Sequence, residues 1–278
     1  MEGFLLKLYR KILYIMIALF VAAAADIHIE LNYPKLIREW VETDKIQQGE
    51  ALTVLHLTDL HSKWFGGDNE RLFGLVSKAD PDIIVCTGDV VDKTADVDIF
   101  AYSYTFFEGL LRFGKPVFYV SGNHEPWDDW EALQRQAVQQ GVRVLVNQNE
   151  TVQIGTSSVT ICGIEDFNTK YHDLNAALAG TDNQTYTILL SHTPAAADQL
   201  PEGKVDLMIS GHTHGGQVRL PVIKDHIMKE KDILRKYSKG FYRLGATLLY
   251  VDSGLGTTRV PLRFLNRSQM TIFEIKGM

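Results

Sequence analysis

The chain has 278 residues, of which 45% are hydrophobic and 22% charged, and its net charge is −6. A chain of this length buries one large core or at most two modest ones, and its composition is ordinary for a globular protein. The acidic balance lacks the basic surface that nucleic-acid-binding proteins carry, so we expect no nucleic-acid partner. The two cysteines, Cys86 and Cys162, lie within apolar runs and are predicted to be buried thiols, neither paired nor nucleophilic.

The amino terminus combines basic residues with a long apolar run. Lys7, Arg10 and Lys11 come before the uninterrupted apolar run Ile12–Ala25. This pattern is typical of a secretory signal peptide or a signal anchor, and a soluble amphipathic or buried helix is the alternative. Because basic residues favour the cytoplasmic side, the rest of the chain is expected outside the cytoplasm. We therefore predict that residues 1–25 are a signal peptide or a signal-anchor transmembrane helix, so that the body is either held at the cytoplasmic membrane or exported after cleavage.

The next part of the chain alternates strand and helix patterns. Residues 26–50 are polar and mixed, and are predicted to form a linker that leads to an edge strand. After residue 50, the apolar patterns predict strands at Leu52–Leu57, Asp82–Thr87 and Pro116–Ser121 and helices at Glu70–Lys78, Val97–Arg112 and Trp127–Gln140. This alternation favours a parallel sheet with helices outside it.

The rhythm changes after Gly141, and the second half is richer in strands. Strands are predicted at Val142–Val146, Thr151–Ile154, Ser158–Cys162, Tyr186–Ser191, Leu207–Ser210, Gln217–Leu220, Thr247–Val251 and Met270–Ile275. The charged segment Ile223–Tyr242 has no clear strand periodicity and is predicted to be a mobile insertion or lid. Because no Pro/Gly-rich linker divides residues 51–278, we expect a single domain there.

Five predicted strands run directly into polar motifs. The motifs are Asp59-Leu60-His61, Gly88-Asp89-Val90-Val91-Asp92, Gly122-Asn123-His124-Glu125, Ser191-His192 and Gly211-His212-Thr213-His214. In an open α/β sheet, functional groups collect beyond the carboxyl ends of the strands, so these side chains are expected to converge. A solvated loop would explain one such motif, but five at five strand ends point to a common site. The glycines before Asp89, Asn123 and His212 permit tight turns.

The ligand types suit a pair of metal ions. Carboxylate, imidazole and amide groups are present in the number that two ions need. Their mixture favours manganese, iron or zinc over calcium or a thiolate-bound metal. Two divalent ions a few Å apart are a common catalyst for the hydrolysis of phosphate esters.

The five motifs resemble the pattern D-x-H, G-D-x-x-D, G-N-H-[DE], H, G-H-x-H of the calcineurin-like metallophosphoesterase superfamily. All five occur in that order between residues 59 and 214. The resemblance implies an α/β sandwich of two packed β-sheets flanked by helices (α/β/β/α). It also implies that residues 51–278 form a metallophosphoesterase domain, in which a metal-bound hydroxide attacks phosphodiesters or phosphomonoesters. No covalent enzyme intermediate is needed.

The second half is similar to a narrower, membrane-associated bacterial branch of that superfamily. The similar segments are Gly211-His212-Thr213-His214-Gly215-Gly216-Gln217, Leu220-Pro221, Gly254-Leu255-Gly256-Thr257-Thr258 and Pro261-Leu262-Arg263-Phe264. The branch includes cell-wall-associated phosphoesterases and relatives that hydrolyse the pyrophosphate of UDP-2,3-diacylglucosamine. Asp252-Ser253 stands here where an Arg precedes Gly-Leu-Gly in that group. The implied partners are a membrane and a phosphorylated small molecule, lipid or cell-envelope substrate.

The resemblance also implies a role for each site residue. Its first metal ion takes the ligands Asp59, His61, Asp89 and His214. Its second metal ion takes the ligands Asp89, Asn123, His192 and His212, with Asp89 shared by both. Manganese is the preferred metal, with iron or zinc as alternatives. His124 faces the scissile phosphate and does not bind metal, Glu125 orients His124, and Asp92 supports the ligands without being one.

Other readings remain open at this level. The activity is alternatively that of a pyrophosphatase acting on a UDP-linked lipid, or the chain is a metal-binding module without catalysis. Four arginines are candidate clamps for a distal phosphate, although each is more often a solvated charge: Arg219, Arg243, Arg259 and Arg263. His56 lies within the first predicted strand of the body and is interpreted as a packed residue.

Overall fold

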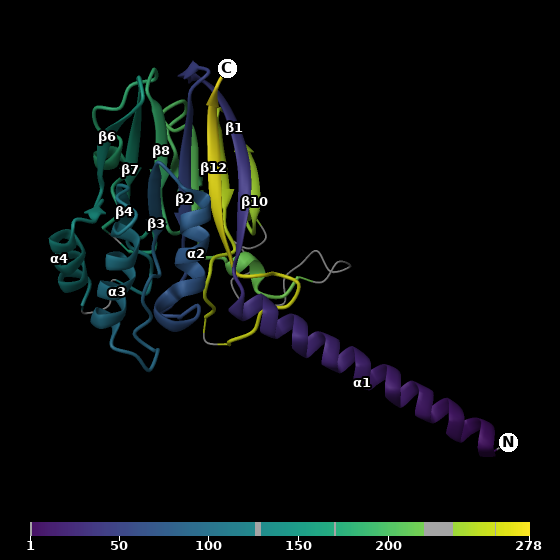
Figure 1. Ribbon diagram of the computed structural model, residues 1–278. Coiled ribbons are helices and arrows are strands. Elements are labelled where there is room, and N and C mark those ends of the chain that lie inside the picture. The colour runs from purple at the N-terminus through teal and green to yellow at the C-terminus, as the bar shows by residue number, and fades with distance from the viewer. Residues whose placement is uncertain (1, 126–128, 170, 220–235, 259) are drawn as a thin grey trace.

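The computed structural model describes residues 2–125, 129–169, 171–219, 236–258 and 260–278. Within these ranges, the strands form two sheets of six strands each (Figure 1). In spatial order, the first sheet contains β1 (Lys35–Gln48), β12 (Gln269–Gly277), β2 (Ala51–Leu57), β3 (Ile83–Thr87), β4 (Val117–Val120) and β5 (Arg143–Val144). The second contains β10 (Gly240–Leu244), β11 (Thr247–Val251), β9 (Leu207–Ser210), β8 (Tyr186–Leu190), β7 (Ser157–Gly163) and β6 (Gln148–Ile154).

Both sheets are mixed but have parallel centres. In the first sheet β2, β3, β4 and β5 run parallel, and β12 lies antiparallel to β2. In the second sheet β7, β8, β9 and β11 run parallel, between the antiparallel edge strands β6 and β10. The parallel centres bring the carboxyl ends of β2, β3, β4, β8 and β9 to one edge of the molecule. We call this edge the rim.

An apolar layer joins the two sheets. Strand side chains alternate between faces, and the inward set meets across the sandwich. Val85 and Phe118 from the first sheet and Ile161, Ile188 and Ile209 from the second are all 0% exposed in one cluster. Their burial supplies the hydrophobic free energy that holds the rim together from below.

Helices cover the outer faces of the sandwich. On the first sheet lie α2 (Glu70–Ala79), α3 (Ile99–Leu111) and α4 (Trp130–Gln140), with a short 3₁₀ helix, η1 (Gly67–Asn69), before α2. The outer cluster on the second sheet includes residues of the short helices α5 (Leu174–Ala177) and η2 (Pro194–Gln199). A further 3₁₀ helix, η3 (His214–Gly216), lies at the rim. The α/β sandwich of two sheets flanked by helices is therefore confirmed.

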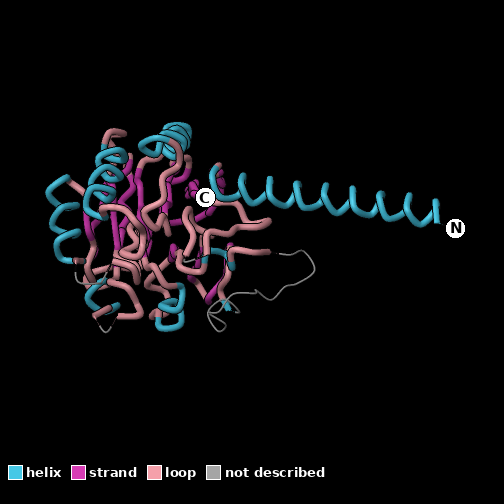
Figure 2. The backbone as a smooth tube through the Cα atoms, turned by 90° about the horizontal axis from the view of Figure 1, so that it is seen from below, coloured by secondary structure: helices cyan, strands magenta, loops and turns pink. Residues whose placement is uncertain are grey.

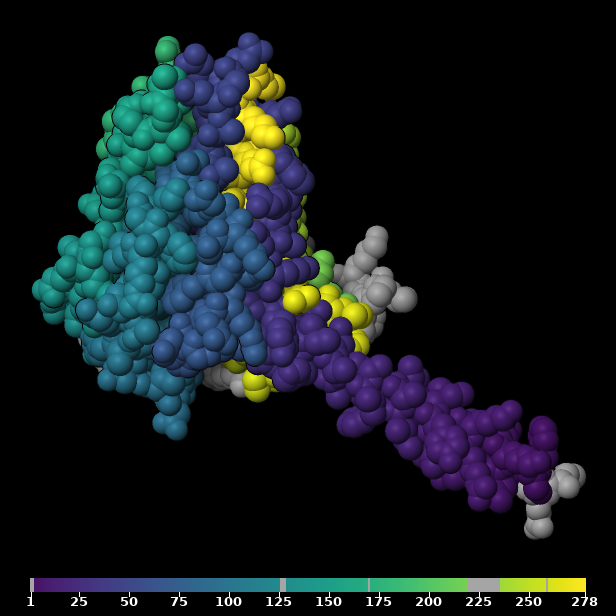
Figure 3. Space-filling view, in the orientation of Figure 1, coloured from purple at the N-terminus to yellow at the C-terminus, as the bar shows by residue number. Residues whose placement is uncertain are grey.

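Helix α1 (Glu2–Asn32) projects from this body as a single continuous rod, as Figures 2 and 3 show. Its 31 residues correspond to roughly 46 Å of helix. The segment Gly3–Asn32 is long and apolar enough to cross a membrane, and its most apolar stretch has no residue buried in the protein. The helix thus continues past the predicted apolar run, and the segment expected to be a linker is helical as far as Asn32, before the fourteen-residue edge strand β1.

The structure corrects two predicted elements. The segment Gln217–Leu220 is not a strand where it is described: Val218 makes one isolated bridge to Phe264, and Leu220 lies outside the described residues. The predicted insertion Ile223–Tyr242 contains the start of β10, which pairs with β11 through Gly240 and Val251, while residues 223–235 lie outside the described part of the chain. The charged residues of this segment obscured the alternation of exposed and half-buried side chains in β10, which is an edge strand of the second sheet.

Candidate metal centre

The predicted site residues meet at the rim, and both sheets contribute to it. In chain order, Asp59 and His61 follow β2, Asp89 and Asp92 follow β3, Asn123, His124 and Glu125 follow β4, His192 follows β8, and His212 and His214 follow β9. The apolar strands below them are regular, so each strand end is held at a fixed height against its neighbours.

One group of ligand atoms comes from Asp59, His61 and His214, whose potential donor atoms all lie within 4.8 Å of one another. The Nε2 atoms of His61 and His214 are 3.2 Å apart, and Nε2 of His214 lies 3.5 Å from Oδ1 of Asp59. Two imidazoles and a carboxylate therefore point at a common centre.

A second group comes from Asp89, His192 and His212. Nε2 of His192 lies 3.0 Å from Nδ1 of His212 and 3.0 Å from Oδ1 of Asn123. Oδ2 of Asp89 is 3.2 Å from Nε2 of His192 and 3.4 Å from Nε2 of His61. One carboxylate oxygen thus lies between the two groups, as a shared ligand must.

The surroundings of the imidazoles fit metal binding. A histidine that binds metal usually donates its other ring N–H to a carboxylate or a backbone carbonyl, which aims the free nitrogen at the ion. Nδ1 of His192 lies 2.8 Å from the carbonyl oxygen of Thr87, a hydrogen bond that directs Nε2 of His192 at Oδ2 of Asp89. Nδ1 of His61 makes no hydrogen bond within the described part of the chain, although it lies at ion-pair distance, 3.3 Å, from Oδ2 of Asp92. The described clusters are consistent with a dinuclear metal site.

The backbone at the rim is strained. Five of the seven predicted ligands have a left-handed conformation: Asp59 (φ 53°), His61 (φ 50°), Asp89 (φ 51°), His212 (φ 70°) and His214 (φ 49°). Each such residue other than glycine costs on the order of 1 kcal/mol. Because these side chains are polar, and all but that of His212 are buried, apolar packing does not compensate for the strain. Such a cost is expected where the backbone must aim ligands at a fixed point.

Glycines beside the ligands are needed mainly for space. Among the three predicted to permit tight turns, only Gly88 has a positive φ, of 85°. A Cβ atom on Gly122 would overlap the carboxylate of Asp89, and one on Gly211 would overlap the side chains of Thr58 and Asp59. Any larger residue at these two positions would displace a ligand.

The two other acids at the rim have different partners. The sequence assigns the orientation of His124 to Glu125, but the carboxylate that the structure places on this imidazole is that of Asp92, whose Oδ1 lies 3.3 Å from Nδ1 of His124. Glu125 is 1% exposed and accepts backbone N–H groups from Asp89 (2.8 Å), Val90 (2.5 Å) and Gly122 (2.7 Å). Glu125 thus fixes the loop that carries Asp89.

His124 belongs to a third group of potential ligand atoms with His61 and Asp89. Its side chain is nevertheless 20% exposed, whereas that of His192 is fully buried. Its backbone N–H donates to Oδ1 of Asp89 at 2.9 Å, which holds the residue directly above the shared ligand. His124 is therefore placed between the metal-ligand groups and solvent.

Protonation at the rim reflects burial and mutual charge. Burial lowers the pKa of His214 well below the ordinary histidine value, and the nearby His61 adds to the effect. For His192, burial acts in the same direction, but the charge of Asp89 outweighs it and raises the pKa well above that value. Burial raises the pKa of the Asp59 carboxyl. Of these three groups, His192 is therefore the one that favours its protonated form near neutral pH in the metal-free protein, and a bound cation would displace that proton.

A buried polar layer supports the rim, and sequence reasoning missed most of it. His56 is 0% exposed, as predicted for a packed residue. Its Nε2 lies 2.7 Å from Oγ1 of Thr87, and the carbonyl oxygen of the same Thr87 is the hydrogen-bond partner of Nδ1 of His192. Nδ2 of Asn266 donates to the carbonyl oxygen of His214 at 2.7 Å. Asn266 is more than fifty residues away in sequence and belongs to no recognisable motif, so nothing in the sequence marks it.

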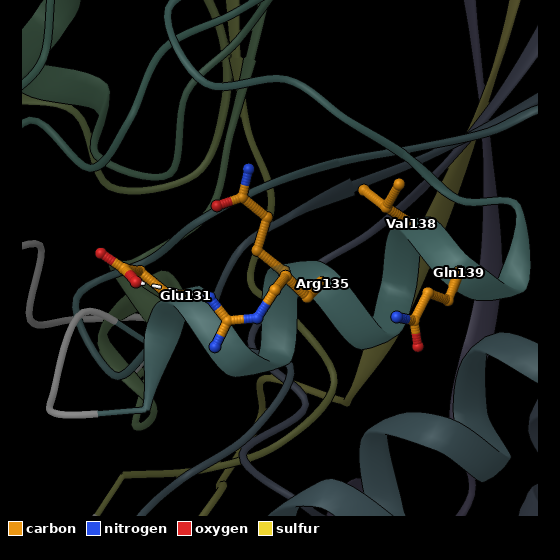
Figure 4. A pocket seen from close by; sticks show the side chains of 5 residues that line it. Glu131, Arg135, Val138 and Gln139 are labelled. Carbon is orange, nitrogen blue, oxygen red and sulfur yellow. Dashed lines mark hydrogen bonds and ion pairs between the residues drawn. The ribbon is translucent and has the colours of Figure 1, made fainter.

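Two of the candidate arginine clamps, Arg263 and Arg219, donate to backbone carbonyl oxygens of the protein itself. Arg263 is 0% exposed and donates to the carbonyl oxygens of Ser253 and Gly256, both at 2.6 Å. Arg219 donates to a backbone carbonyl of η3, and Arg259 lies outside the described residues. Figure 4 shows a separate hollow on α4, lined by Glu131, Gln134, Arg135, Val138 and Gln139. No predicted site residue lines this hollow.

Comparison with known proteins agrees with this geometry. Residues 52–216 match the family model described as calcineurin-like phosphoesterase. An uncharacterized metallophosphoesterase of Bacillus subtilis, YkuE, is 31% identical over 259 residues, which cover 90% of this chain and 88% of that protein. A transmembrane protein with a metallophosphoesterase domain from Danio rerio is 26% identical, over 87% of this chain and 57% of its own length. The crystal structure of the protein TT1561 of Thermus thermophilus has a TM-score of 0.52 at 14% identity, covers 74% of this chain and 91% of its own, and shares the fold.

Proposed function

This chain belongs to the calcineurin-like phosphoesterase family and is a metallophosphoesterase, and from that premise we propose that two metal ions at the rim serve the hydrolysis of phosphodiesters or phosphomonoesters. The observation that carries the proposal is the position of one carboxylate oxygen, Oδ2 of Asp89, within 3.4 Å of His61 and 3.2 Å of His192. A single oxygen shared by two ligand sets is what a pair of closely spaced ions requires.

Each ion has a defined ligand set in this proposal. Asp59, His61, Asp89 and His214 hold the first, and Asp89, Asn123, His192 and His212 hold the second. Mixed carboxylate, amide and imidazole donors suit manganese best, with iron or zinc as alternatives. When bound, the two ions lower the pKa of a water molecule and offset the negative charge of the phosphate.

His124 acts on the substrate rather than on a metal. Burial lowers its pKa, but the hydrogen bond to Asp92 and the charge of Asp89 outweigh burial, so the pKa is raised above the ordinary histidine value. A larger fraction of His124 is therefore protonated near neutral pH. Its exposed ring can donate that proton to the leaving oxygen, while Asp92 keeps the ring in place.

The substrate is proposed to be a phosphorylated small molecule, lipid or cell-envelope component. The alternative activity, cleavage of a pyrophosphate in a UDP-linked lipid, is favoured by one observation: the apolar helix α1 ends at the rim, where Lys63 donates to the carbonyl oxygen of Leu31. Asp252 in place of an arginine, and the inward direction of Arg263, weigh against a clamp of the kind that recognises a distal phosphate. We further propose that α1 is a retained anchor in the cytoplasmic membrane, with the body outside the cytoplasm.

The test is hydrolysis by the purified full-length protein in detergent. It is stripped of metal, reloaded with Mn²⁺, Fe²⁺ or Zn²⁺, and assayed with p-nitrophenyl phosphate, bis-p-nitrophenyl phosphate and a UDP-linked lipid. We expect turnover that depends on added metal, with Mn²⁺ the most effective, and no turnover by Asp89→Asn. Protein that binds two ions and hydrolyses none of the three substrates would instead support a catalytically silent metal-binding module.

A further inference from the structure

The carboxyl end of α1 is bonded to the rim. The backbone N–H of Leu265 donates to Oδ2 of Asp26 at 3.2 Å, and that of Ser268 donates to the carbonyl oxygen of Glu30 at 2.9 Å. Nζ of Lys63 donates to the carbonyl oxygen of Leu31 at 2.5 Å. These contacts span the last two turns of the helix, so the direction of α1 is fixed with respect to the body (Figure 1).

The loop beside this end of the helix turns an apolar surface outward. Val260 is 48% exposed and Leu265 is 46% exposed, and Pro261 between them is exposed as well. The one charged residue within Val260–Leu265, Arg263, is 0% exposed because its guanidinium group donates to carbonyl oxygens inside the protein. We call residues 260–265 the apolar loop.

Asp26 sets the height of the apolar loop relative to a bilayer. It is the first charged residue after the apolar run Ile12–Ala25. The stretch of about 20 residues needed to cross the hydrocarbon layer reaches back from Ala25 to Leu6, with the long basic side chains before Ile12 able to extend to the interface. If α1 spans a membrane, Asp26 therefore lies at the interface with water. Leu265 is bonded to Asp26 and lies at the same depth. Figure 3 shows this part of the chain, in yellow, against the base of the purple helix.

The apolar loop is linked to the predicted metal centre by a short chain of contacts. Asn266 follows Leu265 directly, and its Nδ2 donates to the carbonyl oxygen of His214. One residue and one side chain, roughly 10 Å, thus separate the apolar loop from a predicted metal ligand. On another strand end, Lys63 lies two residues after His61 and contacts the helix directly.

We propose that the apolar loop inserts into the headgroup region of the bilayer beside α1 and seats the rim on the membrane surface. The partner is a lipid bilayer, because the loop lies beside Asp26, the residue that directly follows the exposed apolar run of α1, and because Arg263 is withdrawn from the loop surface. The consequence is a metal centre that receives phosphate groups held at the membrane surface. This inference rests on the proposed retention of α1 as an anchor, and it does not depend on the chemistry assigned to the rim.

Fluorescent labels at single introduced cysteines test the inference in full-length protein reconstituted into phosphatidylcholine–phosphatidylglycerol vesicles. The native thiols do not interfere, because Cys86 and Cys162 are both 0% exposed. Labels are placed at Val260→Cys and Leu265→Cys in the apolar loop. Control labels are placed at Ile15→Cys on α1 and at Thr156→Cys, in the exposed β6–β7 turn at the opposite end of the strands.

Lipids that carry a spin label near the headgroup should quench both loop labels severalfold more strongly than the label at Thr156→Cys. The label at Ile15→Cys should be quenched by lipids labelled deep in the acyl chain, which shows that α1 spans the bilayer. If Ile15→Cys is quenched and both loop labels behave like Thr156→Cys, the seating proposal is overturned and the anchor stands. If the loop labels escape quenching by the spin-labelled lipids only at high protein density in the vesicles, a second copy of the chain covers the loop, and the proposal is likewise wrong.

A charge substitution gives an independent measurement. Val260→Asp in the Leu265→Cys background should reduce quenching of the loop label severalfold, while Thr156→Asp in that background leaves it unchanged. Hydrolysis of bis-p-nitrophenyl phosphate by the same preparations reports the proposed function separately. Vesicles that hydrolyse the substrate but show no quenching of the loop labels refute the seating proposal alone. Vesicles whose loop labels are quenched but which hydrolyse no substrate refute the proposed function alone.

Discussion

The layer between the two sheets and the base of the rim above it are both buried, but they are composed of opposite kinds of residue. Phe118 and Ile188 lie on regular strands in apolar contact, whereas Asp59 and His192 are just as inaccessible, and Asp59 has a left-handed backbone. The sheet layer lowers the free energy of the folded state without any ligand. The rim brings together buried charges and strained backbone, and both raise the free energy of the folded state. A bound cation would offset much of this cost.

The largest effect that leaves both metal ions bound is expected from the imidazole that faces solvent at the rim. His124→Ala should lower turnover by roughly 10²–10⁴-fold, the usual range for a lost proton donor, and leave two metal ions bound. Steady-state kinetics with metal analysis of the same sample measures both properties. His172→Ala, outside the rim, serves as the control. A variant that loses one ion would assign His124 to the ligands.

The sheet layer should respond in the opposite way. Phe118→Ala leaves a cavity between the sheets and should lower the free energy of unfolding by about 3–5 kcal/mol, as judged by urea denaturation of the metal-free protein. Asp59→Asn removes a carboxylate whose charged form is disfavoured by burial, and it retains an acceptor for the backbone N–H of His212, so the free energy of unfolding should fall by less than in Phe118→Ala. Equal losses in the two variants would erase the distinction between the layer and the rim.

A pH dependence should arise where the two regions meet. Burial lowers the pKa of His56 to about 4. Between about pH 6.5 and pH 4, His56 therefore binds a proton in the unfolded chain but not in the folded one. The free energy of unfolding is then highest above about pH 6.5 and falls by about 3 kcal/mol as the pH drops toward 4. Urea denaturation of metal-free protein at pH 7.5 and 4.5 should show a smaller loss for His56→Gln than for the native chain. Parallel losses would mean that His56 does not titrate in this window.

The smallest effect is expected behind the ligands. Asp92 contacts both His61 and His124, so Asp92→Asn should reduce activity or metal affinity by about 10–100-fold rather than abolish either. Activity is measured over a range of Mn²⁺ concentrations, with Asp129→Asn as the matched control. Complete loss of one ion from Asp92→Asn would place Asp92 among the ligands.

The difference between the two regions also explains what could be predicted. The parallel strands were predictable because β2, β3 and β4 are mostly apolar, and the motifs because each follows such a strand directly. Leu207–Ser210 and Thr247–Val251 are strands with the bounds that their patterns predict. The edge strand β10 was not predictable, since an edge strand half exposed to water lacks a clear apolar pattern.

The supporting residues at the rim escaped prediction for a different reason. Asn266 and Arg263 donate hydrogen bonds to backbone carbonyl oxygens. Because every residue has a backbone carbonyl, the sequence does not show which residue accepts such a bond. Glu125 was recognised in its motif, but its contacts with the backbone of Asp89 and Gly122 depend on the close approach of two loops. Motifs identify which residues gather at the rim, and tertiary contacts decide what each of them touches.

The most direct test of a two-metal rim is the metal content of the full-length protein. The chain is stripped with a chelator, reloaded with Mn²⁺, passed through a desalting column and analysed for metal per chain, alongside Asp89→Asn and the control Asp129→Asn. We predict about two ions for the native chain and the control, as expected for a paired site, and fewer than one tightly bound ion for Asp89→Asn. Two tightly bound ions in Asp89→Asn would contradict the shared role of this carboxylate and the account built on it.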